Sequence, residues 1–301
     1  MAYDLVNKLV IGVSSRALFD LRKENDIFEK EGVKAYRDYQ IQHENDILNP
    51  GPGFSLIKAL LSLNKLLNDS HSIEVIIMSR NSADTSLRVF NSIKHYNLDI
   101  TRAVLASGGS LAPYLNAFHT DLFLSAYEDD VQEAINSGIA AGIICNDSDK
   151  SYSPCDDIDK IRIAFDGDAV LFTDESELIY QEKGLEAFEE NERINANNPL
   201  PKGPFANFLK AISDIQEKFP EEDSPIRTAL VTARSAPAHE RVIRTLRAWN
   251  VRIDEAFFLG GVQKKDFLEA FGANIFFDDQ AIHTSPASEV VPSFRVPVKK
   301  R

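Results

Sequence analysis

The two halves of this 301-residue chain resemble each other without gaps over a long stretch. When residues 11–60 are laid on residues 163–212, about eleven of about fifty positions are identical, where chance gives roughly one in seventeen. The matched positions include glycine, proline and asparagine: Gly32 with Gly184, Asn45 with Asn197, and Gly51-Pro52 with Gly203-Pro204. Shared periodicity alone would not align such residues, so we infer a duplication and expect two similar folds in one chain.

The alignment continues to the end of each half after one further residue of shift. It pairs residues 78–83 with 231–236, 95–100 with 248–253, 105–109 with 258–262, and 121–126 with 274–279. We therefore expect two domains, residues 1–150 and residues 151–301. The boundary is expected in Asn146–Lys160, because this polar, proline-containing stretch has few apolar side chains to bury.

Short apolar segments alternate with longer amphipathic ones in both halves. The expected strands are Leu9–Val13, Ile73–Met78, Ala103–Ala106, Leu122–Leu124, Ile161–Phe165, Thr228–Val231, Ala256–Leu259 and Ile275–Phe277. The expected helices include Phe54–Leu67, Asp84–His95, Phe205–Lys218 and Ala238–Trp249. Continuously apolar strands separated by helices are typical of parallel sheets covered on both faces, so the predicted fold class is α/β. The last residues, 291–301, are expected to form a solvated tail.

Charge and composition exclude several classes of protein. A net charge of −13 argues against binding to nucleic acid or to an anionic membrane surface. No apolar segment has the roughly 18 residues of a membrane span, and the first residues do not resemble a signal peptide. The two cysteines, Cys145 and Cys155, suit free thiols in a reducing compartment. We expect a cytoplasmic protein.

Two carboxylates follow one of the apolar strands in the second half. Asp166 and Asp168 come directly after Ile161–Phe165 and are separated by Gly167, which allows a close approach of the backbone to a ligand. The carboxyl ends of strands in open α/β sheets are where ligands bind. A surface turn is the competing interpretation of the two acids.

Three further strands end near residues that suit the same site. Asp278 and Asp279 follow Ile275–Phe277, Thr232 follows Thr228–Val231, and Lys264 comes after the strand near residue 259. Clustered carboxylates repel one another unless protons or a hard cation neutralise them, and Mg²⁺ is the usual intracellular cation. The second half is therefore expected to hold Mg²⁺.

The order of these residues resembles that of the haloacid-dehalogenase-like (HAD) phosphatase superfamily. The segments VSSRALFD, HENDILNPGPGF, AFDGDAVLFTDESE, LVTARSA and IFFDDQ together resemble the type I cytosolic 5′-nucleotidase family. The resemblance covers nearly the whole chain. It implies a HAD-like Rossmannoid parallel sheet with a small helical cap, preceded by a degenerate duplicated HAD-like half.

The resemblance also implies a role for each residue. Asp166 would be the nucleophile, and Asp168 would act as general acid and base while its backbone carbonyl binds the metal. Lys264 and Thr232 would contact the transferring phosphoryl group. Asp166, Asp168, Asp278 and Asp279 would be the metal ligands, with either member of the Asp278-Asp279 pair in direct contact with Mg²⁺. The implied reaction is hydrolysis of AMP-like nucleoside 5′-monophosphates.

Several alternatives stay open on the sequence alone. Thr232 could instead cap a helix, and Lys265 competes with Lys264 for the buried position. Arg234 could bind substrate phosphate or base, or be an exposed arginine at a helix start. The substrate could be another phosphoester such as a sugar phosphate, or the chain could sense nucleotides with little turnover. A homo-oligomer is also compatible with the sequence.

The first half lacks the residues of this constellation. In the repeat, Ser14 takes the place of Asp166, Arg16 that of Asp168, Ser79 that of Thr232, Leu111 that of Lys264, and Ser125-Ala126 that of Asp278-Asp279. We expect this half to be catalytically silent. In the second half, residues 173–227 are expected to form the cap, with the acidic segment Glu186–Glu192 as its solvated face.

Overall fold

The computed structural model describes residues 4–67, 72–145 and 160–300, which pack into two compact units. We call the described residues 4–137 unit 1, and the described residues 138–145 and 160–300 unit 2. The expected boundary in Asn146–Lys160 lies outside the described residues except for Lys160, and Cys155 also lies outside them. Within the described residues, no helix is both long enough and apolar enough to cross a membrane.

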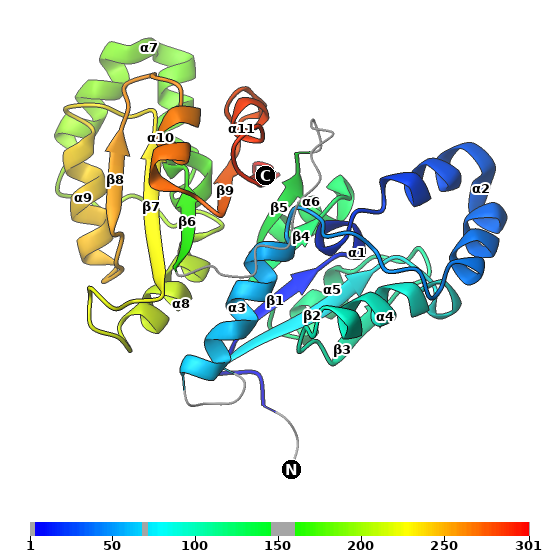
Figure 1. Ribbon diagram of the computed structural model, residues 1–301. Coiled ribbons are helices and arrows are strands. Elements are labelled where there is room, and N and C mark those ends of the chain that lie inside the picture. The colour runs from blue at the N-terminus through cyan, green and yellow to red at the C-terminus, as the bar shows by residue number, and fades with distance from the viewer. Residues whose placement is uncertain (1–3, 68–71, 146–159, 301) are drawn as a thin grey trace. The chain divides into compact units, whose positions relative to one another are not determined.

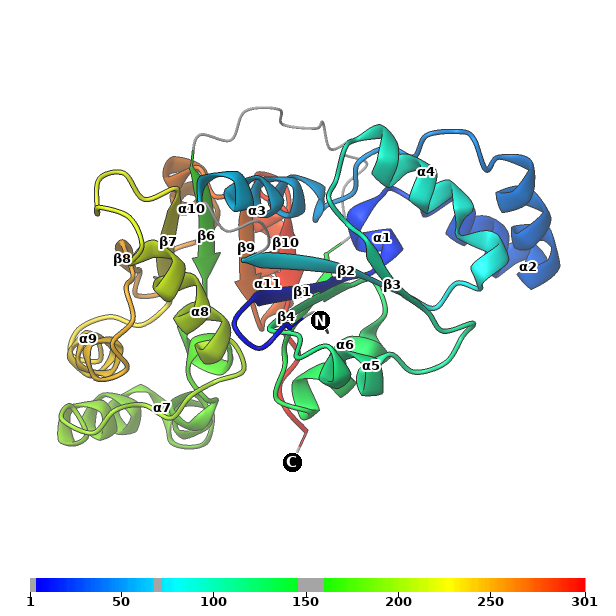
Figure 2. The same cartoon turned by 90° about the horizontal axis from the view of Figure 1, so that it is seen from below.

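Unit 1 alternates strands with helices (Figure 1). Its strands are β1 (Leu9–Val13), β2 (Ile73–Ser79), β3 (Arg102–Leu105) and β4 (Leu122–Ser125). Its helices are α1 (Ser15–Leu18), α2 (Arg22–Gln42), α3 (Phe54–Leu66), the short η1 (Ala83–Thr85), α4 (Leu87–His95), α5 (Ala112–Ala117) and α6 (Glu128–Asn136). The strands pair in parallel in the order β3-β2-β1-β4. Helix α2 contacts α4, which lies beside it in Figure 2.

Unit 2 repeats this order and adds strands at one edge. Its strands are β5 (Ala140–Ile144), β6 (Ile161–Phe165), β7 (Ile226–Thr232), β8 (Glu255–Phe258), β9 (Ile275–Asp278) and β10 (Ser293–Arg295). Its helices are α7 (Glu175–Ile194), α8 (Ala206–Gln216), α9 (His239–Ala248), α10 (Lys265–Phe271) and α11 (Ala281–Ala287), with a short turn η2 (Gly167–Leu171) after β6. The order is β5-β10-β9-β6-β7-β8, parallel throughout except that β5 runs antiparallel to β10.

These parallel strands and covering helices confirm the predicted α/β class. The predicted solvated tail at residues 291–301 is wrong, because β10 pairs with both β9 and β5. Phe294 of β10 is fully buried, with its ring centroid 5.9 Å from that of Phe277. An aromatic side chain that buries this much apolar surface holds the segment in the sheet. The prediction rested on the basic residues of this segment and gave no weight to Phe294.

The two units share details that no general α/β pattern requires. Helices α2 and α7 each contain one glycine with φ of 83° and extended ψ, and these are the paired Gly32 and Gly184. The hydroxyl of Ser92 accepts a hydrogen bond from the Leu48 backbone N–H at 3.0 Å. At the matching positions, the hydroxyl of Thr245 accepts one from Leu200 at 2.9 Å. The sequence repeat is thus also a repeat of structure.

One ion pair is kept in both units with its charges exchanged. Glu74 of β2 pairs with Arg102 of β3 in unit 1. The matching residues of unit 2 are Arg227 and Glu255, which pair at 2.9 Å. Side chains that face each other across neighbouring strands interact as a pair, so the contact survives when both partners change. This exchange supports a common origin of the two units.

The core of unit 2 fixes the ends of the strands that carry the candidate site. Alternate residues of β6 and β9 face opposite sides of the sheet, as the pleat of a strand requires. Ala164 and Phe276 pack in the cluster that includes Leu268 of α10. On the other face, the ring of Phe165 lies 6.2 Å from that of Phe208 in α8. Helix α8, which lies within residues 173–227, therefore covers the sheet, and both α7 and α8 contact turn η2.

Candidate active site

Three neighbouring strands of unit 2 end in polar side chains. Strand β6 lies between β7 and β9, and all three run parallel, so their carboxyl ends meet at one edge. Asp166 follows β6 directly, Thr232 is the last residue of β7, and Asp278 is the last residue of β9. Asp166 is 5% exposed, Thr232 1% and Asp278 0%. A surface turn at Asp166 is therefore not what the chain forms.

A buried lysine joins two of these carboxylates. Lys264 precedes α10 and is 2% exposed. Its ammonium lies 2.8 Å from Asp166 Oδ1 and 2.6 Å from Asp278 Oδ2. Lys265, the competing candidate, instead pairs with Glu289 at the surface. The structure therefore brings Lys264 into the cluster and leaves Lys265 outside it.

The acids outnumber the lysine in this buried cluster. Carboxylate oxygens of Asp166, Asp278 and Asp279 lie within 4.8 Å of one another, the one such potential metal-binding group among the described residues. Asp279 Oδ1 is buried without a hydrogen-bond partner in that part of the chain. Hard oxygen donors with an unsatisfied buried oxygen are the ligands that Mg²⁺ prefers, so the residues fit this ion.

The excess negative charge changes the proton affinity of the acids. Burial, reinforced by Asp166 and Asp278, raises the pKa of Asp279 to about 8. Burial also raises the pKa of Asp166 to about 6, against the opposing effect of Lys264. Burial lowers the proton affinity of Lys264, but Asp166 and Asp278 outweigh it and raise its pKa. The cluster holds protons or a cation near neutral pH.

The turn after β6 brings the backbone close to Thr232. A Cβ at Gly167 would lie 3.3 Å from both Thr232 Oγ1 and the ring of Phe172, tighter than most contacts of this kind. Ala169 has φ of 59°, the left-handed region that alanine rarely adopts. The Thr232 hydroxyl accepts the Arg234 N–H at 3.2 Å and keeps its own proton to donate. Thr232 does not cap a helix, since α9 begins only at His239.

The side chain of Asp168 is held by an arginine. Arg234 donates from Nε to Asp168 Oδ2 at 2.7 Å and from Nη2 to Asp168 Oδ1 at 2.6 Å. Its third nitrogen donates to Glu192 at 2.6 Å. Burial alone would lower the pKa of Arg234, but Asp168 and Glu192 raise it. Two charge-assisted hydrogen bonds fix the orientation of the Asp168 carboxylate.

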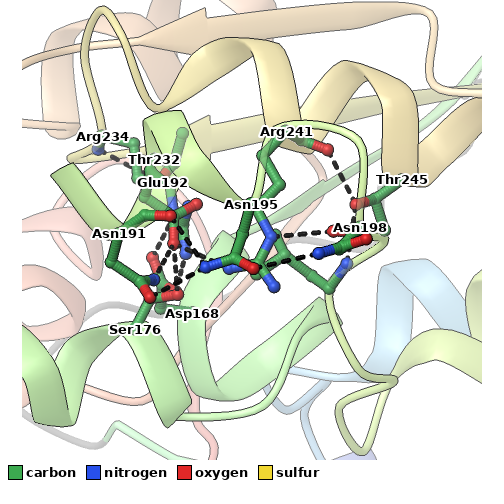
Figure 3. A network of polar contacts seen from close by, with 11 residues as sticks. Asp168, Ser176, Asn191, Glu192, Asn195, Asn198, Thr232, Arg234, Arg241 and Thr245 are labelled. Carbon is green, nitrogen blue, oxygen red and sulfur yellow. Dashed lines mark hydrogen bonds and ion pairs between the residues drawn. The ribbon is translucent and has the colours of Figure 1, made fainter. Parts of the chain in front are cut away.

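Glu192 is the centre of a second layer of contacts. Figure 3 shows it between Arg234 and Arg241, which donate to its two oxygens at 2.6 and 2.9 Å. The Ser176 hydroxyl adds a hydrogen bond at 2.8 Å. Because Arg241 lies in α9 and Arg234 in the loop after β7, this carboxylate ties α7 to both, while Ser176 comes from the first turn of α7 itself.

Two sequence interpretations are corrected here. Arg234 is not an exposed arginine at a helix start, because it is 4% exposed and paired on both sides. Glu192 is not part of a solvated face, because it is fully buried. Its spacing held a signal: Glu192 follows the buried Phe188 by four residues, which places both on one face of α7. The signal was hidden among the exposed acids of the same helix.

The matching edge of unit 1 has no such acid cluster. Ser14 caps α1, accepting the Ala17 backbone N–H at 3.2 Å, and the hydroxyls of Ser15 and Ser79 lie 3.2 Å apart. No described residue of unit 1 joins a group of acids, cysteines or histidines that could hold a metal. The strand ends are kept while the charged groups differ.

Unit 2 is thus an α/β unit whose parallel strands gather acids and a lysine at their carboxyl ends. The family model for 5′-nucleotidases matches residues 1–301, and the chain belongs to this family. Human cytosolic 5′-nucleotidase 1B is 41% identical to it over 294 residues, which is 94% of this chain and 48% of the human protein. The chain thus spans about half the length of this curated relative, and the resemblance seen in its sequence motifs is confirmed.

Proposed function

We propose that unit 2 hydrolyses nucleoside 5′-monophosphates through a phosphoryl group carried on Asp166. The observation that carries the proposal is the buried contact of Lys264 with both Asp166 and Asp278 at the ends of adjacent strands. Membership of the 5′-nucleotidase family supports the reaction class. A site that only binds nucleotides would not need a carboxylate nucleophile in contact with a buried lysine.

In the first step, an oxygen of Asp166 attacks phosphorus while the bond from phosphorus to the 5′-oxygen breaks. Asp168 gives a proton to that leaving oxygen, so the nucleoside departs neutral. Lys264 offsets negative charge on Asp166 and on the phosphoryl oxygens, and Thr232 can donate its hydroxyl proton to one of them. An Asp168 oxygen must leave Arg234 to reach the substrate, because both oxygens are held by it here.

In the second step, water attacks the phosphorus of the aspartyl phosphate. Asp168 takes the proton of this water, the bond between phosphorus and Asp166 breaks, and inorganic phosphate leaves. Both carboxylates return to their starting states, so atoms and protons balance over the cycle.

We further propose that Asp166, Asp278 and Asp279 hold Mg²⁺, together with the backbone carbonyl of Asp168. When bound, this ion neutralises charge on the phosphate that would otherwise repel a carboxylate nucleophile. Because Arg234 already binds the carboxylate of Asp168, we assign the metal contact to the backbone carbonyl of Asp168. The unpaired Asp279 oxygen supports a place for this residue beside the ion.

A turnover screen tests the proposed reaction and its substrate class. The protein is assayed for phosphate release from nucleoside 5′-monophosphates and sugar phosphates, with Mg²⁺ and with a chelator. We expect Mg²⁺-dependent release from nucleoside monophosphates such as AMP. Preference for sugar phosphates would contradict the substrate assignment. Tight binding of AMP without release would indicate a nucleotide sensor and overturn the reaction.

The raised pKa values predict two effects of rising pH: the metal-free protein becomes less stable, and the stabilisation that Mg²⁺ adds becomes larger. The pKa of Asp279 rises from 3.8 to about 8 on folding, so the folded state holds a proton that the unfolded state lacks. The melting temperature without metal should therefore fall as pH rises from about 5 to 8. Mg²⁺ competes with these protons, so its stabilisation should grow over the same range. An equal Mg²⁺ effect at both ends would contradict the assigned ligands, and Asp279→Asn should flatten the difference.

Arg234 is proposed as a positioning residue for Asp168. Arg234→Lys keeps the charge but loses the pair of hydrogen bonds to the two oxygens of Asp168. We expect kcat to fall by about 10- to 100-fold, which is part of the rate gain that general acid–base catalysis gives. KM should change little. A large rise in KM at constant kcat would instead mark Arg234 as a substrate ligand. Arg244→Lys, in an exposed pair with Glu240, is the matched control and should be neutral.

A further inference from the structure

Unit 1 contains a cavity at the edge of its sheet that corresponds to the candidate active site of unit 2. Its volume is about 520 Å³, within the range of small-molecule sites. It is lined by residues that follow β1, β2, β3 and β4, and by α2. Unit 1 therefore has a hollow at the edge where unit 2 gathers its carboxylates.

The cavity carries three arginines at positions that are not basic in unit 2. Arg37, at the position of Glu189, pairs with Asp84 at 2.5 Å. Arg16 occupies the position of Asp168, and Arg80 that of Ala233. Their guanidinium carbons lie 5.4 and 5.3 Å from the ring centroid of Tyr127. Stacking of this kind holds a guanidinium in place while its N–H edge stays available.

Arg16 and Arg80 differ in their ion-pair partners. Arg80 is bound by Asp130, with contacts of 2.7 and 2.9 Å. Arg16 has no ion pair with any carboxylate in the described part of the chain. Glu24, the acid in the lining, is already paired with Arg88 at 2.6 Å. The charge of Arg16 is thus left for an anion.

The space in this cavity follows from another replacement. In unit 2, the Arg234 guanidinium lies 5.3 Å from the Phe188 ring and is held by Asp168 and Glu192. The matching residue of unit 1 is Asn81, whose shorter side chain lines the cavity. Its buried Nδ2 donor makes no hydrogen bond of good geometry among the described residues, although the Tyr36 hydroxyl lies near it. A poorly satisfied amide donor and an arginine without an ion pair, lining one cavity, suit an acceptor-rich ligand.

Aromatic side chains line the same cavity. Phe28 and Tyr36 of α2 pack edge to face, with ring centroids 5.9 Å apart, and Tyr127 supports two of the arginines. Planar rings offer stacking surfaces for a nucleobase. We propose that this cavity binds a nucleoside phosphate without cleaving it, with Arg16 and Asn81 on the phosphate and aromatic rings on the base. This second site goes beyond the proposed reaction of unit 2.

Equilibrium dialysis of radiolabelled AMP against the full chain tests this second site. Asp166→Asn provides the background, so that the probe is not hydrolysed. We expect two AMP molecules per chain in this background and one after Arg16→Gln is added, with the affinity of the lost site reduced about 10- to 100-fold. Arg16→Lys keeps the positive charge but loses the planar set of N–H donors, so it should give an intermediate loss of affinity.

The outcomes separate this site from the proposed reaction. If unit 2 does not bind AMP, the background binds one molecule, and Arg16→Gln should still abolish that binding. Equal stoichiometry and affinity with and without Arg16→Gln, in protein whose melting curve shows it folded, would overturn the second site. Inorganic phosphate binding as tightly as AMP at the Arg16-dependent site would overturn the nucleoside part. Arg193→Gln, in an exposed pair with Glu190, is the control and should not change binding.

Discussion

Asp166→Asn should lower phosphate release from AMP by at least about 10⁴-fold, because the amide keeps the shape of the side chain but is not a nucleophile. The variant should fold as the parent does. Its melting temperature without Mg²⁺ should not fall, since one of three crowded acids becomes neutral. Steady-state phosphate release at saturating AMP and Mg²⁺ measures the effect, alongside a thermal melt.

The repeat supplies a matched control for this variant. Ser14 occupies the same position in unit 1 and caps α1 through its hydroxyl. Ser14→Ala should cost about 1 kcal/mol of stability, as the loss of a cap does, and leave turnover within about twofold. Loss of turnover in a folded Ser14→Ala protein would contradict the proposal that unit 1 is catalytically silent. Unchanged turnover in Asp166→Asn would refute the nucleophile.

Lys264→Met should cost both stability and activity. The substitution keeps most of the side-chain volume but leaves Asp166 and Asp278 without their buried cation, which costs about 3–5 kcal/mol in comparable pairs. The loss should be smaller near pH 5 than near pH 8, because the acids can take up protons instead. Turnover should fall by about 10²- to 10³-fold, as for other groups that stabilise charge in a transition state.

The neighbouring lysine provides the comparison for Lys264. Lys265 pairs with Glu289 at the surface, so Lys265→Met should change stability by less than about 1 kcal/mol and leave turnover intact. Urea unfolding at the two pH values and the phosphate-release assay measure both variants. Equal effects of the two substitutions would show that the buried position of Lys264 has no special role.

The sequence predicted those parts of the fold that depend on local pattern. The expected strands Leu9–Val13 and Ile161–Phe165 have the bounds observed for β1 and β6, because each is a continuous apolar segment with a polar boundary. Asp166, Thr232 and Asp278 were expected together, and they meet because parallel strands share one carboxyl edge. Such convergence follows from topology alone.

The contacts of Arg234 could not be predicted in the same way. Its partners Asp168 and Glu192 lie far away along the chain, and the one local sign that Glu192 is buried while Glu190 is exposed is its four-residue spacing from Phe188. The short β10 was missed for a related reason. Its place in the sheet depends on pairing with β9 and β5, and not on its own composition. Burial of these residues is a property of the whole fold.

Chemical trapping on the parent protein tests the central proposal most directly. The protein is quenched with borohydride during turnover of AMP in Mg²⁺, which reduces an aspartyl phosphate to homoserine, and its peptides are mapped by mass spectrometry. The proposal predicts homoserine at position 166 and at no position of unit 1. Homoserine at another residue, or steady turnover with Asp166 unmodified under every quench time, would contradict it.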